Sequence, residues 1–134
     1  MRFTRRAPHL AAVAFPFVLL GCASTPKPSD LPSALEAGWD GDRVCELLHE
    51  SATQRMLRCT FPPGVGHERH YHPAHFGYAL SGGTMRITDA GGTREVRLDT
   101  GSSYASDGTV WHEVVNVGNT PVIYLIVEEK AGLR

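Results

Sequence analysis

The chain alternates apolar and polar residues over short runs that are separated by glycine, proline and aspartate. In one run Leu57, Cys59 and Phe61 fall on the same face, because successive side chains of a strand point to opposite sides. The runs 109–117 and 122–129 are rich in β-branched and aromatic residues, which favour strands. Many short strands with turns between them predict an all-β fold, an antiparallel sandwich or barrel.

Composition agrees with one folded domain. The 134 residues are 42% hydrophobic and 20% charged, which is ordinary for a globular protein. The 14 glycines and 9 prolines suit short strands and turns better than long helices. The formal net charge is −1 and basic residues do not cluster in the domain, so we expect no nucleic-acid partner.

The N-terminus reads as a targeting segment. Three arginines precede the uncharged apolar run 10–20, which ends in "LLGC" at Cys22. A basic segment, a short apolar segment and a small-residue cleavage site are typical of a secretory signal. The ending resembles the lipobox of bacterial lipoproteins, which implies that residues 1–21 are a signal peptide and that Cys22 is lipidated. The alternative is a transmembrane anchor, for which the apolar run is short, since a span needs ~20 residues.

The lipoprotein interpretation also predicts the domain organisation of the remaining chain. Residues 22–33 would hold the lipidated cysteine and a Pro/Ser-rich linker, and residues 34–134 would form the barrel domain. Cleavage removes three arginines and no acids, so 10 basic against 14 acidic residues leave about −4 on the mature chain. We therefore expect a domain in the bacterial cell envelope, anchored to the membrane by lipid and facing the periplasm.

Two further cysteines lie in neighbouring apolar runs. If these runs pair as a hairpin centred near Ala52, Cys45 and Cys59 lie nearly opposite each other. Outside the cytoplasm such a pair can be oxidised to a disulfide. Two small buried cysteines that stay reduced are the alternative that the sequence leaves open.

Histidines supply the candidate chemistry. Four of the seven in the chain fall within nine positions, in "GHERHYHPAHFG". His70 and His72 are two apart and share a face of the expected strand, so both can offer an imidazole to one ion. A third ligand must come from elsewhere, and His112 follows in a later strand-like run. Imidazole suits Fe, Ni, Cu and Zn, so the donor type does not select the metal.

The two stretches "GVGHERHYHPAHFGYALSGG" and "GSSYASDGTVWHEVVN" together resemble the two motifs of the cupin superfamily, as in small single-domain cupins. The resemblance covers about residues 43–130 and implies a single jelly-roll barrel with one divalent metal, Fe, Mn, Ni or Zn, inside it. The positions that match the motifs are Gly64, His70, His72, Gly83, Gly101, His112 and Asn116.

Three motif positions differ: Asp107 and Thr109 stand where the second motif has Pro and Gly, and the third departure lies in the first motif. The family spacing places a glutamate ligand at position 76, where this chain has Phe76. In one interpretation the ligands are His70, His72 and His112, and Phe76 forms an apolar wall of the ligand pocket. In the other, Pro73 distorts the strand so that His75 turns inward as a fourth ligand; counting back from Gly82 instead of Gly83 also reaches His75.

Four neighbouring residues also have expected positions. We expect His67 outside the site, and Glu68 either at its mouth or in solvent. In an undistorted strand Tyr78 shares the inner face with Phe76, lines the ligand pocket and could donate a proton. Trp111 is expected to pack on the face opposite to His112.

These features leave several functions open. An ion held by imidazoles keeps open coordination positions and could support an iron-dependent dioxygenase or an isomerase of a small organic molecule. The barrel could instead be a non-catalytic module of the envelope that binds a metal or a small molecule. A third possibility is a metal that only stabilises the fold. The cupin resemblance also allows a homodimer.

Overall fold

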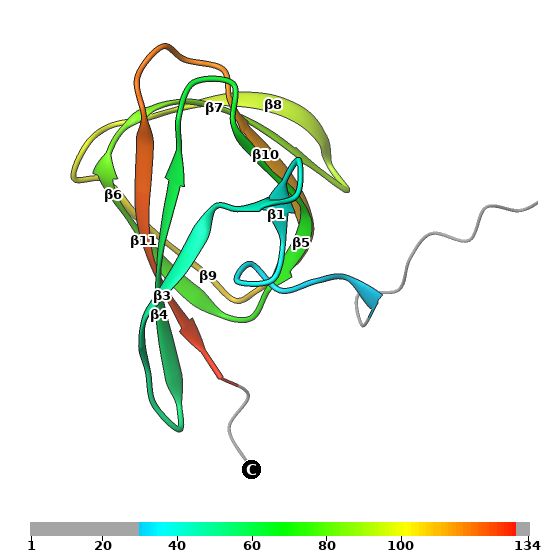
Figure 1. Cartoon of the computed structure of the whole chain (residues 1–134), viewed down its shortest axis with the longest axis vertical. Helices are drawn as coiled ribbons and strands as arrows, with labels where there is room; N and C mark the ends of the chain where they lie inside the picture. The colour runs from blue at the N-terminus through cyan, green and yellow to red at the C-terminus, as the bar shows by residue number, and fades with distance from the viewer. Residues whose placement is uncertain (1–29, 131–134) are drawn as a thin grey trace, which may run out of the picture.

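The computed structural model describes residues 30–130 of the chain, and Figure 1 shows their path. Residues 1–29 and 131–134 lie outside the described part. The signal peptide at 1–21, the lipidation site Cys22 and most of the 22–33 linker therefore remain predictions. Within residues 30–130 no helix is long and apolar enough to cross a membrane.

The described chain is all β. Its strands, in chain order, are β1 (Gly38–Trp39), β2 (Asp42–Arg43), β3 (Cys45–Glu50), β4 (Gln54–Phe61), β5 (Gly66–His72), β6 (His75–Ser81), β7 (Gly83–Asp89), β8 (Gly92–Leu98), β9 (Ser103–Ser106), β10 (Thr109–Asn116) and β11 (Val122–Glu129).

Two antiparallel sheets make up the barrel. One has four strands in the order β5-β10-β7-β8, and the other has five in the order β3-β4-β11-β6-β9. A small hairpin, β1-β2, packs beside β5 (Figure 1). Because strands that follow each other in sequence repeatedly pass between the two sheets, the jelly-roll arrangement that the sequence predicts is confirmed.

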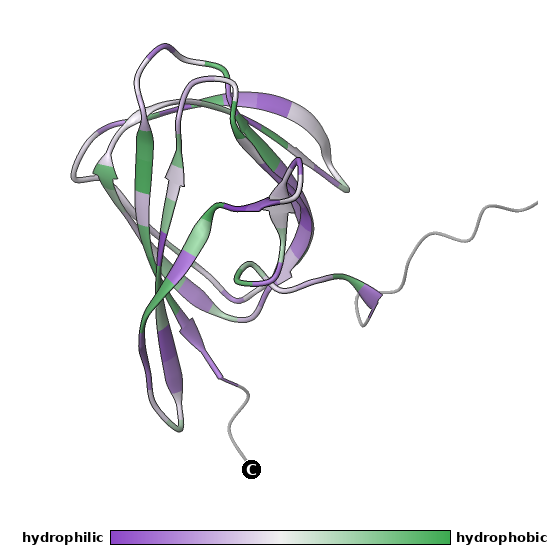
Figure 2. Ribbon diagram, in the orientation of Figure 1, coloured by the Kyte–Doolittle hydropathy of each residue, from purple (hydrophilic) through white to green (hydrophobic). Residues whose placement is uncertain are grey.

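Alternation along the strands builds the core. On β11, Val122, Tyr124, Ile126 and Glu128 are buried, while the residues between them are half-exposed. Figure 2 shows the apolar stretches of β10 and β11 and the more hydrophilic β8 at the rim. The inward residues of β4 meet those of β11, since these two strands pair along their whole length. One end of the barrel is thereby filled, and the histidines occupy the other part of its interior.

The β3–β4 hairpin carries the disulfide. Cys45 and Cys59 are directly opposite in the register, and their sulfurs are bonded. Both cysteines are buried, and Cys59 also lines the interior cavity. The hairpin expected from the sequence is confirmed, and the oxidised alternative is the one that the structure contains.

The N-terminal segment closes one side of the four-stranded sheet. Ser33 forms a parallel bridge with Tyr71, whose backbone N–H donates to the Pro32 carbonyl. The last residues of the expected linker thus pack on the barrel rather than extending freely. "SALEAGW", which hints at a helix, makes only a single turn in which Glu36 accepts hydrogen bonds from Ser33.

Two glycines that match the motifs lie in turns that require glycine in this chain. Gly64 and Gly101 adopt φ values of 79° and 84°, which glycine reaches without a side-chain clash. The Asn116 side-chain amide donates to the carbonyls of Phe61 and Thr120, so this motif residue ties loops together and does not face the histidines.

Candidate metal centre

Strand β5 carries three of the inward histidines. In the register with β10, His70 lies opposite His112 and His67 lies opposite Val114. Three residue positions along β5 therefore match two along β10. The extra residue is a β-bulge, and Glu68 and Arg69 both point outward within it. Because of the bulge His67, His70 and His72 are all buried on the inner side of the strand.

Three of the histidines converge. His70 Nε2 lies 3.0 Å from His72 Nε2 and 3.0 Å from His112 Nε2. The ligand atoms of these three residues all lie within 4.8 Å of one another, and within residues 30–130 this is the group of side chains that could hold a metal ion. The structure thus brings together His70, His72 and His112, the three histidines that the sequence predicts to share one ion.

Hydrogen bonds on the far side of the rings fix which nitrogen carries the proton. His70 Nδ1 lies 2.6 Å from the Glu68 carbonyl, and His72 Nδ1 lies 2.6 Å from Glu128 Oε1. Both oxygens accept, so each Nδ1 donates, and in a neutral ring the Nε2 then presents a lone pair. Two lone pairs that face each other at 3.0 Å repel unless a cation lies between them. The donor set therefore fits a divalent metal.

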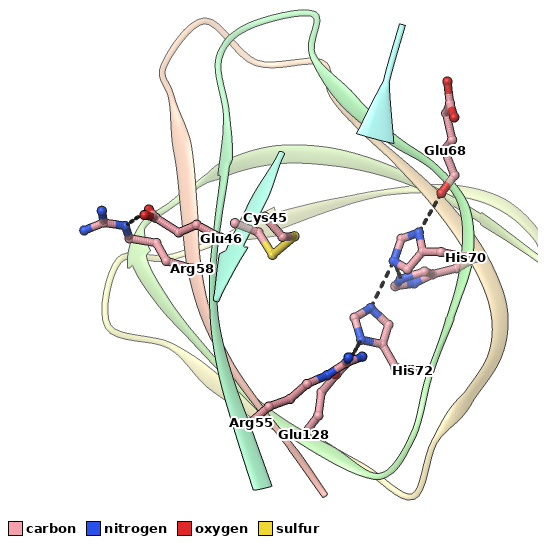
Figure 3. Close-up of a disulfide and its surroundings, with 10 residues drawn as sticks. Cys45, Glu46, Arg55, Arg58, Glu68, His70, His72 and Glu128 are labelled. Atoms are coloured by element: carbon pink, nitrogen blue, oxygen red, sulfur yellow. Dashed lines mark hydrogen bonds and ion pairs between the residues drawn. A yellow bond between two sulfur atoms is a disulfide. The ribbon is translucent and has the colours of Figure 1, made fainter. Parts of the chain in front are cut away.

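A buried carboxylate supports this site from behind. Glu128, on β11, is fully buried and accepts from His72 Nδ1 through one oxygen and from Arg55 Nε through the other (Figure 3). Burial alone would raise the pKa of Glu128, but the bonds from His72 and Arg55 outweigh it and hold the pKa below its usual value. The carboxylate is thus ionised, and it holds the His72 ring in one orientation.

Burial also keeps the histidines neutral. Desolvation, followed by the proximity of other histidines, lowers the pKa of His112 to about 3 and lowers that of His70 still further. The pKa of His75 is lowered too, chiefly by burial. At neutral pH these rings are unprotonated, which is the form that binds metals.

His75 faces inward and Phe76 does not. β6 begins at His75 after the break at Pro73 and Ala74, so its alternation starts anew. His75 is buried and its ring lies 4.6 Å from that of His72, between centroids, whereas Phe76 is 46% exposed. The prediction of Phe76 as a pocket wall is therefore wrong. His75 lies outside the three-histidine group, so its role as a fourth ligand stays a prediction.

Tyr78 follows the same alternation as Phe76. It lies on the outer face of β6 and does not line the cavity that contains the histidines, so its placement in the pocket is also wrong. A different tyrosine, Tyr104, lines this cavity, although 40% of its surface remains exposed. Tyr104 of β9 packs across Gly77, where an added Cβ would meet its ring at 2.3 Å, and its ring touches that of His75 edge-on. Burial raises the pKa of Tyr104, so its hydroxyl stays protonated at neutral pH.

His67 is the second correction on β5. It was expected outside, but it is 2% exposed and its ring stacks on His70 with 3.7 Å between centroids. The bulge, which strand parity cannot anticipate, turns it inward. Its Nε2 has no hydrogen-bond partner among the described residues. Glu68, by contrast, points into solvent, and Trp111 packs under the Arg69 guanidinium on the outer face, 4.0 Å away.

The histidines open onto an interior cavity of about 400 Å³. Its walls are mainly apolar, from residues such as Ile87, Val96, Leu98 and Ile126. Asp89 and Arg94 add a pair of charges, and the polar residues that line it besides the three converging histidines are His67, His75, Tyr104, Ser106 and Thr109. Such a mixture of apolar walls and a few convergent polar groups is typical of a small-molecule site.

Comparison with known proteins places the chain by its fold. Solved structures with the same fold include a cupin domain from Bordetella pertussis (22% identity, TM-score 0.62, covering 75% of this chain and 97% of that one). A cupin-like protein from Thermotoga maritima matches at 14% identity and a TM-score of 0.54, over 65% and 68% of the two chains. The DMSP lyase DddQ from Ruegeria pomeroyi matches at 20% identity and a TM-score of 0.53. The match to the lyase spans 67% of this chain and 48% of the lyase.

No curated protein matches the chain. The family model described as "Cupin domain" matches residues 57–128, more than half of the 134 residues. That stretch begins on β4, ends on β11 and includes the three converging histidines. The chain belongs to the cupin family.

Proposed function

We propose that the protein is a metal-dependent cupin of the bacterial cell envelope that binds one divalent ion through His70, His72 and His112. The observation that carries the proposal is the pair of Nε2 lone pairs that face each other 3.0 Å apart while each ring's Nδ1 donates elsewhere. An ion between them removes the repulsion.

The donor set fits several ions. Imidazole nitrogens bind Fe, Mn, Ni and Zn, so His70, His72 and His112 would accept any of these, and the ligand type alone does not select one. Three protein ligands would leave positions of the ion free for a molecule from the cavity.

We further propose that the protein acts on a small organic molecule, as an iron-dependent dioxygenase or as an isomerase. A bound ion would supply Lewis acidity or redox chemistry at its open positions. The chain's own residues would hold the substrate between apolar walls, and the protonated Tyr104 hydroxyl could donate a hydrogen bond inside the cavity. The competing function is a binding module without turnover.

The test uses the full chain, extracted in detergent and loaded in turn with Fe, Mn, Ni and Zn. Oxygen consumption or conversion of small acids, thiols and phenols that depends on the metal and disappears in Tyr104→Phe would support an enzyme. Calorimetric binding of one of these compounds without turnover by any metal form would favour the binding module. Absence of metal uptake by the wild-type protein would refute both.

The envelope location is a separate proposal that rests on the sequence before residue 30. Mass spectrometry of the N-terminal peptide should find a lipid-modified Cys22 at the new terminus, and Cys22→Ser should release the protein from the membrane fraction. An unprocessed N-terminus in the mature protein would contradict it.

A further inference from the structure

Few charged side chains face the cavity. Apart from the histidines, the charged residues of its lining are Asp89 on β7 and Arg94 on β8. Glu128 lies behind His72 and is already neutralised by Arg55. The two carboxylates and the two guanidinium groups therefore cancel each other, and nothing else in the lining offsets the charge of a bound ion.

Neutral imidazoles make this imbalance important. His70, His72 and His112 would donate lone pairs without adding negative charge, so a divalent ion would keep about two positive charges in a mainly apolar cavity. Electrostatic interactions are stronger in such surroundings than in water. The site would thus select an anionic ligand over a neutral one of the same shape.

Arg94 is placed to give that anion a second contact. Its Nη1 donates to Asp89 Oδ2 at 2.7 Å, and the other oxygen of Asp89 accepts from the Gly91 N–H at 2.8 Å. Asp89 is directly opposite His112 in the register of β7 and β10, so this pair lies on the strand next to a proposed metal ligand. Asp89 is fixed by these bonds and holds the guanidinium at the cavity wall.

The rest of the guanidinium is available. Within residues 30–130 the side chain of Arg94 makes no other hydrogen bond or ion pair, and it is 53% exposed. β8 is the edge strand of its sheet, so Arg94 lines the cavity from an edge of the barrel. A guanidinium presents its N–H groups in a planar fork that matches a carboxylate.

We propose that the ligand of this cavity is a small organic carboxylate, with one carboxylate bound by Arg94 and a metal-binding group at its other end. This inference rests on the proposed function, because the second end needs the ion. The apolar side chains of Ile87, Val96 and Leu98 line the cavity beside Arg94 and would pack on the carbon chain of the ligand.

Binding of matched probes tests the inference. Malonate, succinate and glutarate span a range of lengths, and their monoamides have the same shapes with one charge less. Calorimetry on the metal-loaded full chain should show at least one dicarboxylate binding about tenfold more tightly than its monoamide, as expected for a charge-assisted hydrogen bond. Arg94→Gln should remove this preference.

Arg86 provides the control. Like Arg94 it pairs with an acid across β7 and β8, at 3.3 Å to Glu95, and its side chain is 49% exposed, but it does not line the cavity. Arg86→Gln should keep the tenfold preference. Elemental analysis should find equal metal in both variants and the wild type.

Two results would overturn the inference alone: a metal-loaded wild type with no preference for any dicarboxylate, or a preference that survives in Arg94→Gln. A wild type that takes up no metal would overturn the proposed function and this inference together. The metal content separates the two kinds of failure.

Discussion

Replacing Glu128 with glutamine should weaken metal binding without removing a metal ligand. The carboxylate is fully buried, accepts from His72 Nδ1 at 2.6 Å and is paired with Arg55. Glutamine has nearly the same shape but no charge, and its amide has one acceptor instead of two. Either His72 or Arg55 must then face an NH₂ group, and both are donors.

The size of the effect follows from the role of the bond. Loss of an outer-shell partner of a metal-binding histidine typically costs 10–100-fold in metal affinity, which is about 1.4–2.7 kcal/mol. We expect the upper half of this range, because Glu128 is entirely buried and its bond to His72 is charge-assisted. Competition with a chromophoric chelator would measure the change directly.

The matched control is Glu46→Gln. Glu46 also pairs with an arginine of β4, Arg58, at 2.5 Å, but its side chain is 54% exposed and does not line the cavity that contains the metal-site histidines. An exposed pair of this kind contributes about 1 kcal/mol or less to stability, and nothing links it to the metal. Equal metal affinity in Glu128→Gln, Glu46→Gln and the wild type would refute the proposed support of His72.

Three further predictions use other parts of the fold. Replacing Cys45 and Cys59 together with alanine should lower the free energy of unfolding by about 3 kcal/mol in urea titrations, given the 14-residue separation; an unchanged midpoint would contradict this. The metal-free protein should lose stability as the pH falls from 6.5 towards 4, since burial holds the pKa of His67 at about 4 and only the unfolded chain takes up the proton. The loss from this ring is about 3 kcal/mol at pH 4, and His67→Phe should reduce it; an equal pH dependence in that variant would argue against the assignment. Phe76→Gln should leave the metal dissociation constant within about twofold, because the side chain faces solvent, and a larger change would restore the inward reading.

The sequence predicted the fold because its strands are short and strongly patterned. Alternation on β4 placed Leu57, Cys59 and Phe61 on one face, and the structure buries all three. His70 and His72 were assigned to one face for the same reason, and the motif spacing added His112 from a distant strand. These inferences needed only a strand of regular geometry.

The errors arose where a strand is irregular. The bulge between His67 and His70 adds one residue, which reverses the parity before it. The break after His72 restarts the alternation, so that His75 rather than Phe76 faces inward. The alternation of side chains cannot be extended across either interruption. The bulge had no signal in the sequence, whereas Pro73 indicated that the strand could break after His72.

Glu128 was missed although a signal was present. Alternation in "VIYLIVEE" places it on the same face as Val122, Tyr124 and Ile126, and an acid on an apolar inner face needs a partner. Tyr104 had no such signal. It lies in the four-residue edge strand β9, and its ring packs on Gly77, its partner in the neighbouring strand β6, where a side chain would leave no room for it.

The central claim is that three histidines hold one divalent ion. Elemental analysis of the full chain, purified from the native membrane with His70→Ala, His112→Ala and His49→Ala variants, tests it most directly, since His49 is an exposed residue outside the cavity. We expect about one metal per chain in the wild type and in His49→Ala, and none in the other two variants. Full metal occupancy after the loss of His70 or His112 would contradict it.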